Sequence, residues 1–191
     1  MHKQIYILAG ANGTGKSTIS RELLPAEGVV YINPDDIARE LNPTAIDRVK
    51  ILAGKETLIR ITRFLDERRS FAIESTLSGN VYVGIIKKAK LLGYKINIIY
   101  AYVDSPEVCI ARIASRVQKG GHNVPDADVR RRYKRSLNNF NATYAPLADY
   151  WLLVYNGDRG ARFVADYERN SGLNVFDQDE YIRFKEVLCR N

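Results

Sequence analysis

The segment Gly10–Ser17 constrains the fold of this chain more than any other part of its sequence. It reads G-A-N-G-T-G-K-S and directly follows an apolar run, Ile5–Ala9. Such a run is typical of a buried β-strand, and G-x-x-x-x-G-K-S after a strand is the pattern of a phosphate-binding P-loop. The sequence therefore predicts a strand, a glycine-rich turn and a helix whose amino end faces the phosphates of a nucleotide.

Each part of this motif has an expected role in binding. Its glycines let the backbone turn tightly enough to direct several N–H groups at phosphate oxygens. We expect Lys16 to lie near the β- and γ-phosphates and the Ser17 hydroxyl to ligate Mg²⁺, so ATP and Mg²⁺ are the expected cofactors. A glycine turn that binds nothing is the alternative, and the complete motif argues against it. The predicted nucleotide-binding residues in this segment are Gly10, Ala11, Asn12, Gly13, Thr14, Gly15, Lys16, Ser17 and Thr18.

Strand and helix signals alternate along the rest of the chain. This alternation predicts an α/β fold, namely a three-layer P-loop NTPase like the nucleoside kinases, with a mostly parallel, five-stranded sheet. The expected strands lie at about 4–9, 29–32, 71–73, 96–103 and 151–155. The length favours one domain, 1–191, whose last part, about 157–191, is an extension with strand pieces near Phe163 and Val175 and a helix from Asp179.

Charge and composition limit the classes of partner and compartment. The net charge of +7 suits anionic ligands such as nucleotides, and by itself would also suit nucleic acid. No apolar run approaches the length of a membrane span, and Met1–Gln4 leads into the first strand without room for a signal peptide. Cys109 and Cys189 lack the spacing of a metal site and are interpreted as free thiols. We therefore expect a cytoplasmic protein that binds no membrane.

Two adjacent acids follow the second expected strand, in the order Asn33-Pro34-Asp35-Asp36. Ligands bind at the carboxyl ends of strands in open parallel sheets, and a kinase needs an acid that accepts the proton of the acceptor hydroxyl. The same residues also suit a helix start, with Asn33 as N-cap and Asp36 reaching back in a capping box. We therefore expect Asp35 to be the general base and Asp36 to lie on the acceptor side, with helix capping as the alternative role for both.

A carboxylate and two hydroxyls, Glu74-Ser75-Thr76, close the third expected strand. At the carboxyl end of a strand, these groups suit an acceptor molecule or a magnesium-bound water. We therefore expect Glu74 and Thr76 to contact the acceptor. A polar entry into a loop is the alternative.

A basic segment that contains two glycines separates the fourth and fifth expected strands. Arg112 and Arg116 are four residues apart and share a helix face, and a run of three arginines follows the Gly120-Gly121 break. The glycines offer a hinge, which predicts a lid at about 117–132 that brings positive charge onto the transferring phosphate. A solvated basic helix face is the alternative. We interpret His122 as a turn residue rather than a catalytic one.

Several of these segments together resemble the zeta toxin family of small P-loop kinases, in particular its short members. The resemblance runs from the first strand to about Tyr155. It is carried by "GANGTGKST", "INPDDIAREL", "FAIESTLSG", "LLGYKINIIYAYVDSP" and "RVQKGGHNVP" followed by "RRRY". Known toxins of this family phosphorylate the sugar 3′-hydroxyl of UDP-N-acetylglucosamine. The resemblance thus implies an ATP-dependent kinase with a small-molecule hydroxyl acceptor, and an antitoxin protein as a candidate partner.

The resemblance also implies roles for single residues. The P-loop lysine and hydroxyl of the family match Lys16 and Ser17, and its strand-3 glutamate matches Glu74. Its lid arginines match Arg116 together with Arg131 or Arg132, which assigns Arg116 and Arg131 to catalysis and Arg132 to the acceptor. Arg112 occupies the place where related nucleotide kinases stack an arginine on adenine.

The general-base aspartate of the family matches Asp35, or Asp36 if the alignment shifts by one. Toxic members carry a basic residue three positions after this base. Counting from Asp35 gives Ala38, whereas counting from Asp36 gives Arg39. The motif therefore leaves the choice between the two aspartates open.

Two functions of other classes fit parts of the sequence. One is an ATP-hydrolysing switch that acts through a partner, although the chain has no Walker B pair of acids after the fourth expected strand. The other is a nucleic-acid end kinase, which would need a basic groove lined by aromatic side chains, and the 12 tyrosines leave that open. We expect a small-molecule acceptor rather than nucleic acid.

Overall fold

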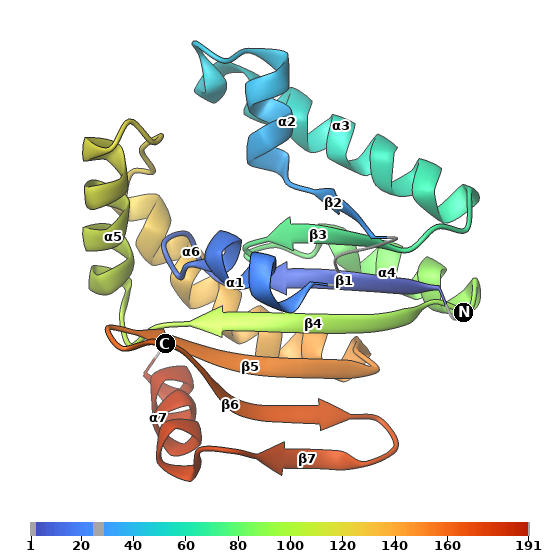
Figure 1. Cartoon of the computed structure of the whole chain (residues 1–191), viewed down its shortest axis with the longest axis vertical. Coiled ribbons are helices and arrows are strands. Elements are labelled where there is room, and N and C mark those ends of the chain that lie inside the picture. The colour runs from blue at the N-terminus through green and yellow to red at the C-terminus, as the bar shows by residue number, and fades with distance from the viewer. Residues whose placement is uncertain (1–2, 25–28, 191) are drawn as a thin grey trace.

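The computed structural model describes residues 3–24 and 29–190. Within these residues, one mixed sheet has the strand order β2-β3-β1-β4-β5-β6-β7 (Figure 1). Its strands are β1 (Gln4–Ala9), β2 (Val30–Ile32), β3 (Phe71–Ser75), β4 (Lys95–Tyr102), β5 (Tyr150–Gly157), β6 (Gly160–Glu168) and β7 (Gly172–Val175). The pairs among β1 to β5 are parallel, whereas β6 and β7 add two antiparallel pairs at one edge.

The α/β P-loop fold is therefore confirmed, but the predicted number of five strands is wrong, because the sheet has seven strands. The difference lies in the C-terminal extension. Its strand piece near Phe163 is part of β6 and pairs with β5, and its strand piece near Val175 is part of β7 and pairs with β6. β7 is an edge strand without a buried residue, so its sequence does not indicate which strand it pairs with.

The helices cover both faces of the sheet. They are α1 (Lys16–Leu23), α2 (Pro34–Leu41), α3 (Ile46–Asp66), α4 (Val81–Leu91), α5 (Pro106–Gln118), α6 (Asp126–Asn139) and α7 (Gln178–Cys189). A π-helical turn, Phe140–Tyr144, and a 3-10 turn, Ala145–Leu147, follow α6. In Figure 1, α1 lies in front of the sheet, and α4 and α6 lie behind it, which gives the three predicted layers.

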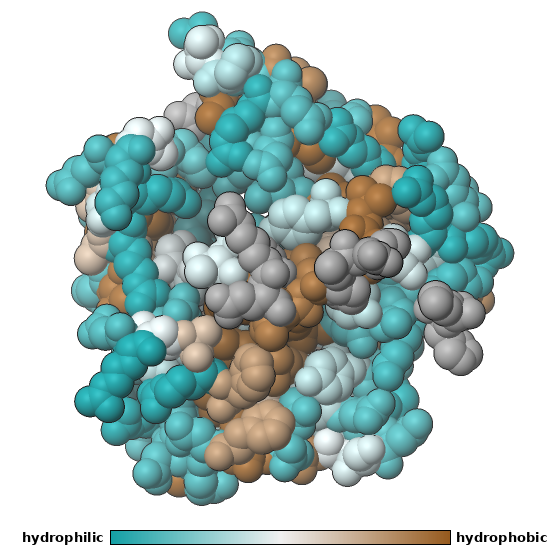
Figure 2. All heavy atoms as spheres, viewed as in Figure 1, coloured by the Kyte–Doolittle hydropathy of each residue, from teal (hydrophilic) through white to brown (hydrophobic). Residues whose placement is uncertain are grey.

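The two faces of the sheet bury cores of different size. Side chains that alternate along each strand point to opposite faces, so Ile7 joins the larger core with α4 and α6, and Leu8 joins the smaller core under α1. Figure 2 shows hydrophilic side chains over α5 and α2. It also shows apolar side chains at the surface over β4 to β6, where α1 does not cover the sheet. Across residues 3–24 and 29–190, every helix is too short or too polar to cross a bilayer.

The parallel strands place the candidate site at one edge of the sheet. The loops that leave the carboxyl ends of β1, β2 and β3 lead into α1, α2 and α4, and all of them meet at this edge. The segment between β4 and β5 contributes α5 and α6, with residues 119–125 connecting them. This connection lies within the predicted lid, about 117–132, and its His122 contacts the start of α2.

Candidate active site

The glycine-rich turn after β1 is packed too tightly for side chains at its glycines. Gly13 has a φ of +86°, and a Cβ there would lie 2.6 Å from the carbonyl oxygen of Cys109 in α5. Gly15 also has a φ of +86°, and its Cβ would lie 2.1 Å from Nδ2 of Asn156. That amide group donates a hydrogen bond to the Thr14 carbonyl at 2.8 Å. Glycine is therefore required where α5 and the end of β5 close over the turn.

Lys16 begins α1 and buries its ammonium group at the centre of the site. The residue is only 7% exposed, and its Nζ donates a hydrogen bond to the Ala11 carbonyl at 2.9 Å. Nζ also lies 4.0 Å from Oε1 of Glu74. Burial lowers the pKa of Lys16 below its usual value, and the carboxylates of Glu74 and Asp35 oppose that shift. An anionic ligand would supply the charge compensation that a buried ammonium group requires.

Glu74, at the end of β3, connects three elements through one carboxylate oxygen. Its Oε2 accepts hydrogen bonds from the Ser17 hydroxyl at 3.1 Å, the Tyr31 hydroxyl at 2.5 Å and the Asn33 amide at 3.4 Å. The predicted magnesium ligand Ser17 and the predicted acceptor residue Glu74 are therefore direct neighbours. The sequence pattern does not single out Tyr31, although its place on β2 beside β3 brings it to the same edge.

The two adjacent aspartates of α2 have different surroundings. Asn33 caps this helix by accepting a hydrogen bond from the Asp35 backbone N–H at 2.9 Å. The Asp35 side chain lines the site, and its Oδ2 lies 3.4 Å from Nε2 of His122. The exposed Asp36 side chain is instead paired with Arg39, one turn along the helix, and lines neither cavity described below.

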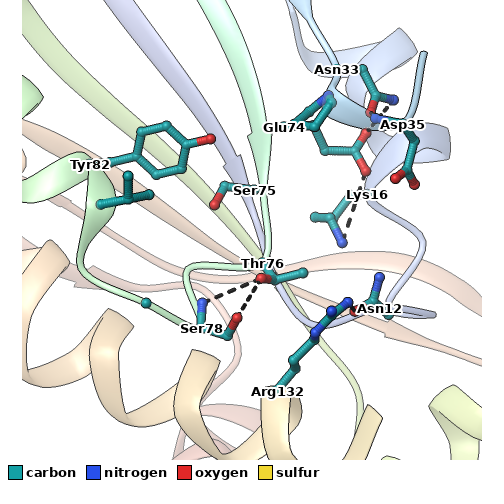
Figure 3. A pocket seen from close by; sticks show the side chains of 13 residues that line it. Asn12, Lys16, Asn33, Asp35, Glu74, Ser75, Thr76, Ser78, Tyr82 and Arg132 are labelled. Carbon is teal, nitrogen blue, oxygen red and sulfur yellow. Dashed lines mark hydrogen bonds and ion pairs between the residues drawn. The ribbon is translucent and has the colours of Figure 1, made fainter. Parts of the chain in front are cut away.

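Two cavities meet at Lys16, Asp35 and Glu74. The first, of about 400 Å³, is bounded on the far side by the β3–α4 loop and by Arg132 (Figure 3). The second, of about 340 Å³, extends along the glycine-rich turn to α5 and the lid. Besides those three residues, both cavities are lined by Asn12 and Asn33. A molecule in each cavity would therefore face the same ammonium group and the same two carboxylates.

The first cavity is lined mainly by hydroxyl groups on the β3–α4 side. Figure 3 shows Thr76, Ser78 and the ring of Tyr82 around its floor, and the hydroxyls of Thr76 and Ser78 lie 2.9 Å apart. Leu77 between them has a φ of +51°, a conformation that non-glycine residues seldom adopt. The Asn139 amide donates a hydrogen bond to the Leu77 carbonyl at 2.8 Å, so α6 holds this turn in place.

The basic residues of α5 and α6 divide into those that reach the site and those that do not. Arg112 and Arg116 line the second cavity, and Arg132 lines the first, with its Nη1 3.1 Å from Oδ1 of Asn12. Arg131 is exposed and forms an ion pair with Asp128 at 2.8 Å, one turn earlier in α6.

The second cavity fits a nucleotide with bound Mg²⁺. Nε of Arg116 is buried, and among the described side chains it is the buried nitrogen or oxygen atom that has no hydrogen-bond partner. An oxygen of a bound phosphate could accept a hydrogen bond from it. Arg112, which also lines this cavity, donates a hydrogen bond to the Gly157 carbonyl at 3.3 Å. The described residues contain no group of three or more His, Cys, Asp or Glu side chains that could hold a metal ion. Magnesium is commonly held by one or two protein groups plus substrate phosphates, and Ser17 suits that role.

His122, like Tyr31, is a site residue whose role the sequence pattern does not indicate. It belongs to the predicted lid, its side chain is 14% exposed, and it lines the second cavity opposite α2. A lone histidine in a polar turn gives no periodic signal, and its contact with Asp35 joins residues far apart in the chain.

The family of the chain follows from its sequence as a whole. A family model described as "Zeta toxin" matches residues 1–165. The chain belongs to the zeta toxin family. The match ends within β6, so β7 and α7 of this zeta toxin family member lie beyond it.

The chain is also similar to individual proteins in sequence or in fold. An uncharacterized protein of Haemophilus influenzae is 33% identical over 133 residues, which cover 70% of this chain and 94% of the relative. A crystal structure of AvrRxo1-ORF1:AvrRxo1-ORF2 with sulphate ions has a TM-score of 0.77 at 16% identity, over 98% of this chain and 64% of the matched one. The chain thus spans less than two thirds of that protein. A structure from the PezAT chromosomal toxin-antitoxin system of Streptococcus pneumoniae has a TM-score of 0.65 at 18% identity, over 98% of this chain and 86% of the matched one.

The structural likeness shows the fold, since both identities lie below 20%. The family membership, together with the geometry of the glycine-rich turn, supports a P-loop kinase that uses ATP.

Proposed function

We propose that this zeta toxin family member transfers the γ-phosphate of Mg²⁺–ATP to a hydroxyl group of a small molecule. The observation that carries the proposal is that Asp35 and Lys16 line both cavities, so a nucleotide and an acceptor would meet at one carboxylate and one ammonium group. In the reaction, the acceptor oxygen forms a bond to the γ-phosphorus, the bond to the β-phosphate oxygen breaks, and ADP leaves. The hydroxyl proton passes to Asp35.

Each side chain has a role that its position supports. Asp35 orients the acceptor hydroxyl and accepts its proton. Lys16 and Arg116 face the phosphates from the glycine-rich turn and from α5, and they neutralise the charge that spreads over the transferring group. Ser17 with its neighbour Glu74 would hold Mg²⁺ on the protein side, and the ion would neutralise part of the phosphate charge.

The lid has a separate role in this proposal, because water competes with the acceptor for the phosphate. Gly121 and His122 of the predicted lid line the second cavity beside α5, where the Arg116 guanidinium donates a hydrogen bond to the His122 carbonyl at 3.0 Å. Closing this segment over ATP excludes water and completes the set of cations around the phosphates.

The proposed acceptor class is a polar molecule with several hydroxyl groups, such as the nucleotide sugar UDP-N-acetylglucosamine. The hydroxyls and carboxylates of the first cavity would bind sugar hydroxyls, and Arg132 at its edge would face an anionic group. The relatives also support an antitoxin protein as a partner, because the PezAT proteins are described as a toxin-antitoxin system.

A phosphoryl-transfer screen with ATP labelled on its γ-phosphate tests the proposed function. Nucleotide sugars, nucleosides, simple sugars and oligonucleotides would each be incubated with the full chain, with hydrolysis in the absence of acceptor as the background. We expect labelled product from a nucleotide sugar and slow hydrolysis without one. Labelled oligonucleotide would instead indicate an end kinase, and hydrolysis without any labelled product would contradict a kinase.

The two neighbouring arginines of α6 provide a matched pair of variants. Arg132→Ala should lower the rate of transfer by about ten- to a hundredfold, because it removes a cation that lines the acceptor cavity. Arg131→Ala should leave the rate nearly unchanged, since Arg131 is exposed and paired with Asp128. Steady-state kinetics of both variants check this prediction, and the opposite order of effects would show that Arg131 is the residue that reaches the phosphates.

A further inference from the structure

We propose that His122 is a positioning residue that couples closure of the lid to the orientation of the general base Asp35. The expected effect of His122 on the transfer rate rests on the proposed function. The contact between the lid and Asp35 does not, and it can be tested on the free protein. Nothing in the family motif assigns this histidine a role, and its pattern in the sequence is that of an ordinary turn.

The backbone of the lid directs the His122 side chain towards α2. Gly120 has a φ of +84°, and the Gly121 N–H donates a hydrogen bond to the Arg116 carbonyl at 3.0 Å. A Cβ on Gly121 would lie 2.6 Å from Cγ of Arg116, so the turn can pack against this arginine only with glycine there. Arg116 in turn donates to the His122 carbonyl at 3.0 Å. The turn is therefore fixed on Arg116, and the next side chain, His122, projects across the cavity to α2.

Asp35 needs such a contact to be held in one orientation. Its backbone N–H is used by the Asn33 cap, but its carboxylate is 42% exposed and lies at the junction of the two cavities. The 3.4 Å approach of His122 Nε2 to Asp35 Oδ2 engages one carboxylate oxygen and leaves the other for an acceptor hydroxyl. When the lid moves away, this contact is lost and the carboxylate can rotate.

The surroundings of His122 lower its pKa and favour its neutral form. Burial is the main cause that lowers the pKa of His122, and the cations Arg116 on α5, Lys50 on α3 and Arg39 on α2 lower it further. Asp35 is the facing group that raises it. A neutral imidazole with its proton on Nε2 can donate to Asp35 and leave it a competent base. A protonated imidazole would form a full ion pair and reduce the basicity of Asp35.

The first experiment tests the contact without any acceptor or ATP. The pKa of His122 is measured by NMR titration of its imidazole in the wild type, in Asp35→Asn and in Asp36→Asn as the matched control. We expect the pKa of His122 to fall in Asp35→Asn, because the facing carboxylate stabilises the imidazolium, and to change much less in Asp36→Asn. An equal pKa in the wild type and Asp35→Asn would overturn the inference.

The second experiment tests the consequence for transfer, with the acceptor found in the screen. His122→Ala should lower kcat by about tenfold, less than the roughly hundredfold or more expected for loss of the base itself, with the KM for ATP within about twofold of the wild type. The exposed neighbour variant Asn123→Ala should behave like the wild type. His122→Gln, which keeps an N–H donor, should recover most of the rate at neutral pH.

The pH profile separates positioning from a merely structural role. In the wild type, kcat should fall on the acid side as His122 becomes protonated, below its usual pKa of 6.5. In His122→Gln this fall should move to lower pH, because no imidazole remains to be protonated beside Asp35. An unchanged acid limb in His122→Gln, or a wild-type kcat in His122→Ala, would overturn the inference. A wild type that phosphorylates no acceptor would instead overturn the proposed function, while the NMR titration still decides the contact.

Discussion

Replacing Lys16 by methionine should lower phosphoryl transfer by at least about a hundredfold, the range expected for loss of one donor to transition-state charge. Methionine fills the space of the lysine stem but carries no charge to the phosphates. The loss should appear in transfer to the acceptor and in background hydrolysis alike, because both reactions use the same nucleotide site. Lys95→Met is a matched control, since Lys95 pairs with Glu168 away from both cavities and should leave transfer unchanged.

The same variant should not destabilise the free protein. Burial lowers the pKa of Lys16 in the folded chain, which means that folding disfavours the protonated ammonium group at every pH below its unfolded pKa. Removing the charge removes this cost, and the main protein partners lost are the Ala11 carbonyl and the Glu74 carboxylate at 4.0 Å. We therefore expect a Tm at least equal to that of the wild type. Addition of ATP should raise the Tm of the wild type more than that of Lys16→Met. Rapid transfer by Lys16→Met would contradict the assigned role of the lysine.

Local patterns are sufficient to predict the centre of the fold. The apolar run before the glycine-rich turn and the Asn33-Pro34 helix start each involve residues within a few positions of one another. Because parallel strands bring their carboxyl ends to one edge, the sequence alone leads us to expect Lys16, Asp35 and Glu74 together.

The strand pairing of the C-terminal extension could not be predicted from local sequence patterns. β6 joins the sheet by pairing with β5, and β7 joins it by pairing with β6, and most of their residues are not buried. Such pairing depends on contacts between strands rather than on a strong apolar signal within each strand. The predicted pieces near Phe163 and Val175 do form strands, but the sheet to which they belong could not be inferred from them alone.

Side-chain partners are the least predictable part of the site. Arg131 and Arg132 are adjacent, and successive helical residues point about 100° apart, so only one of them can face the glycine-rich turn. The sequence could not show which one, and the structure places Arg132 against Asn12. His122 and Tyr31 likewise reach the site through tertiary contacts with Asp35 and Glu74, which no spacing rule reveals.

The second large effect on the transfer rate is expected from replacing one of the two adjacent aspartates. Asp35→Asn should lower the rate of transfer by about a hundred- to ten-thousandfold, the range for loss of a general base. An amide has nearly the shape of a carboxylate but cannot accept the hydroxyl proton in the same way. ATP binding should be retained, because the glycine-rich turn, Lys16 and Arg116 are unchanged. Transfer kinetics and the binding of a non-hydrolysable ATP analogue measure the two properties separately.

Asp36→Asn is the matched control, because it makes the same chemical change one residue along the chain. Asp36 is exposed and pairs with Arg39, so its loss should cost some stability at the start of α2 and little of the transfer rate. A thermal shift without a kinetic effect is the expected result. If Asp36→Asn abolished transfer and Asp35→Asn spared it, the family alignment would be shifted by one, Arg39 would become the basic residue that follows the base, and the contact between His122 and Asp35 would need another explanation. The pair of variants therefore decides which of the two aspartates is the general base.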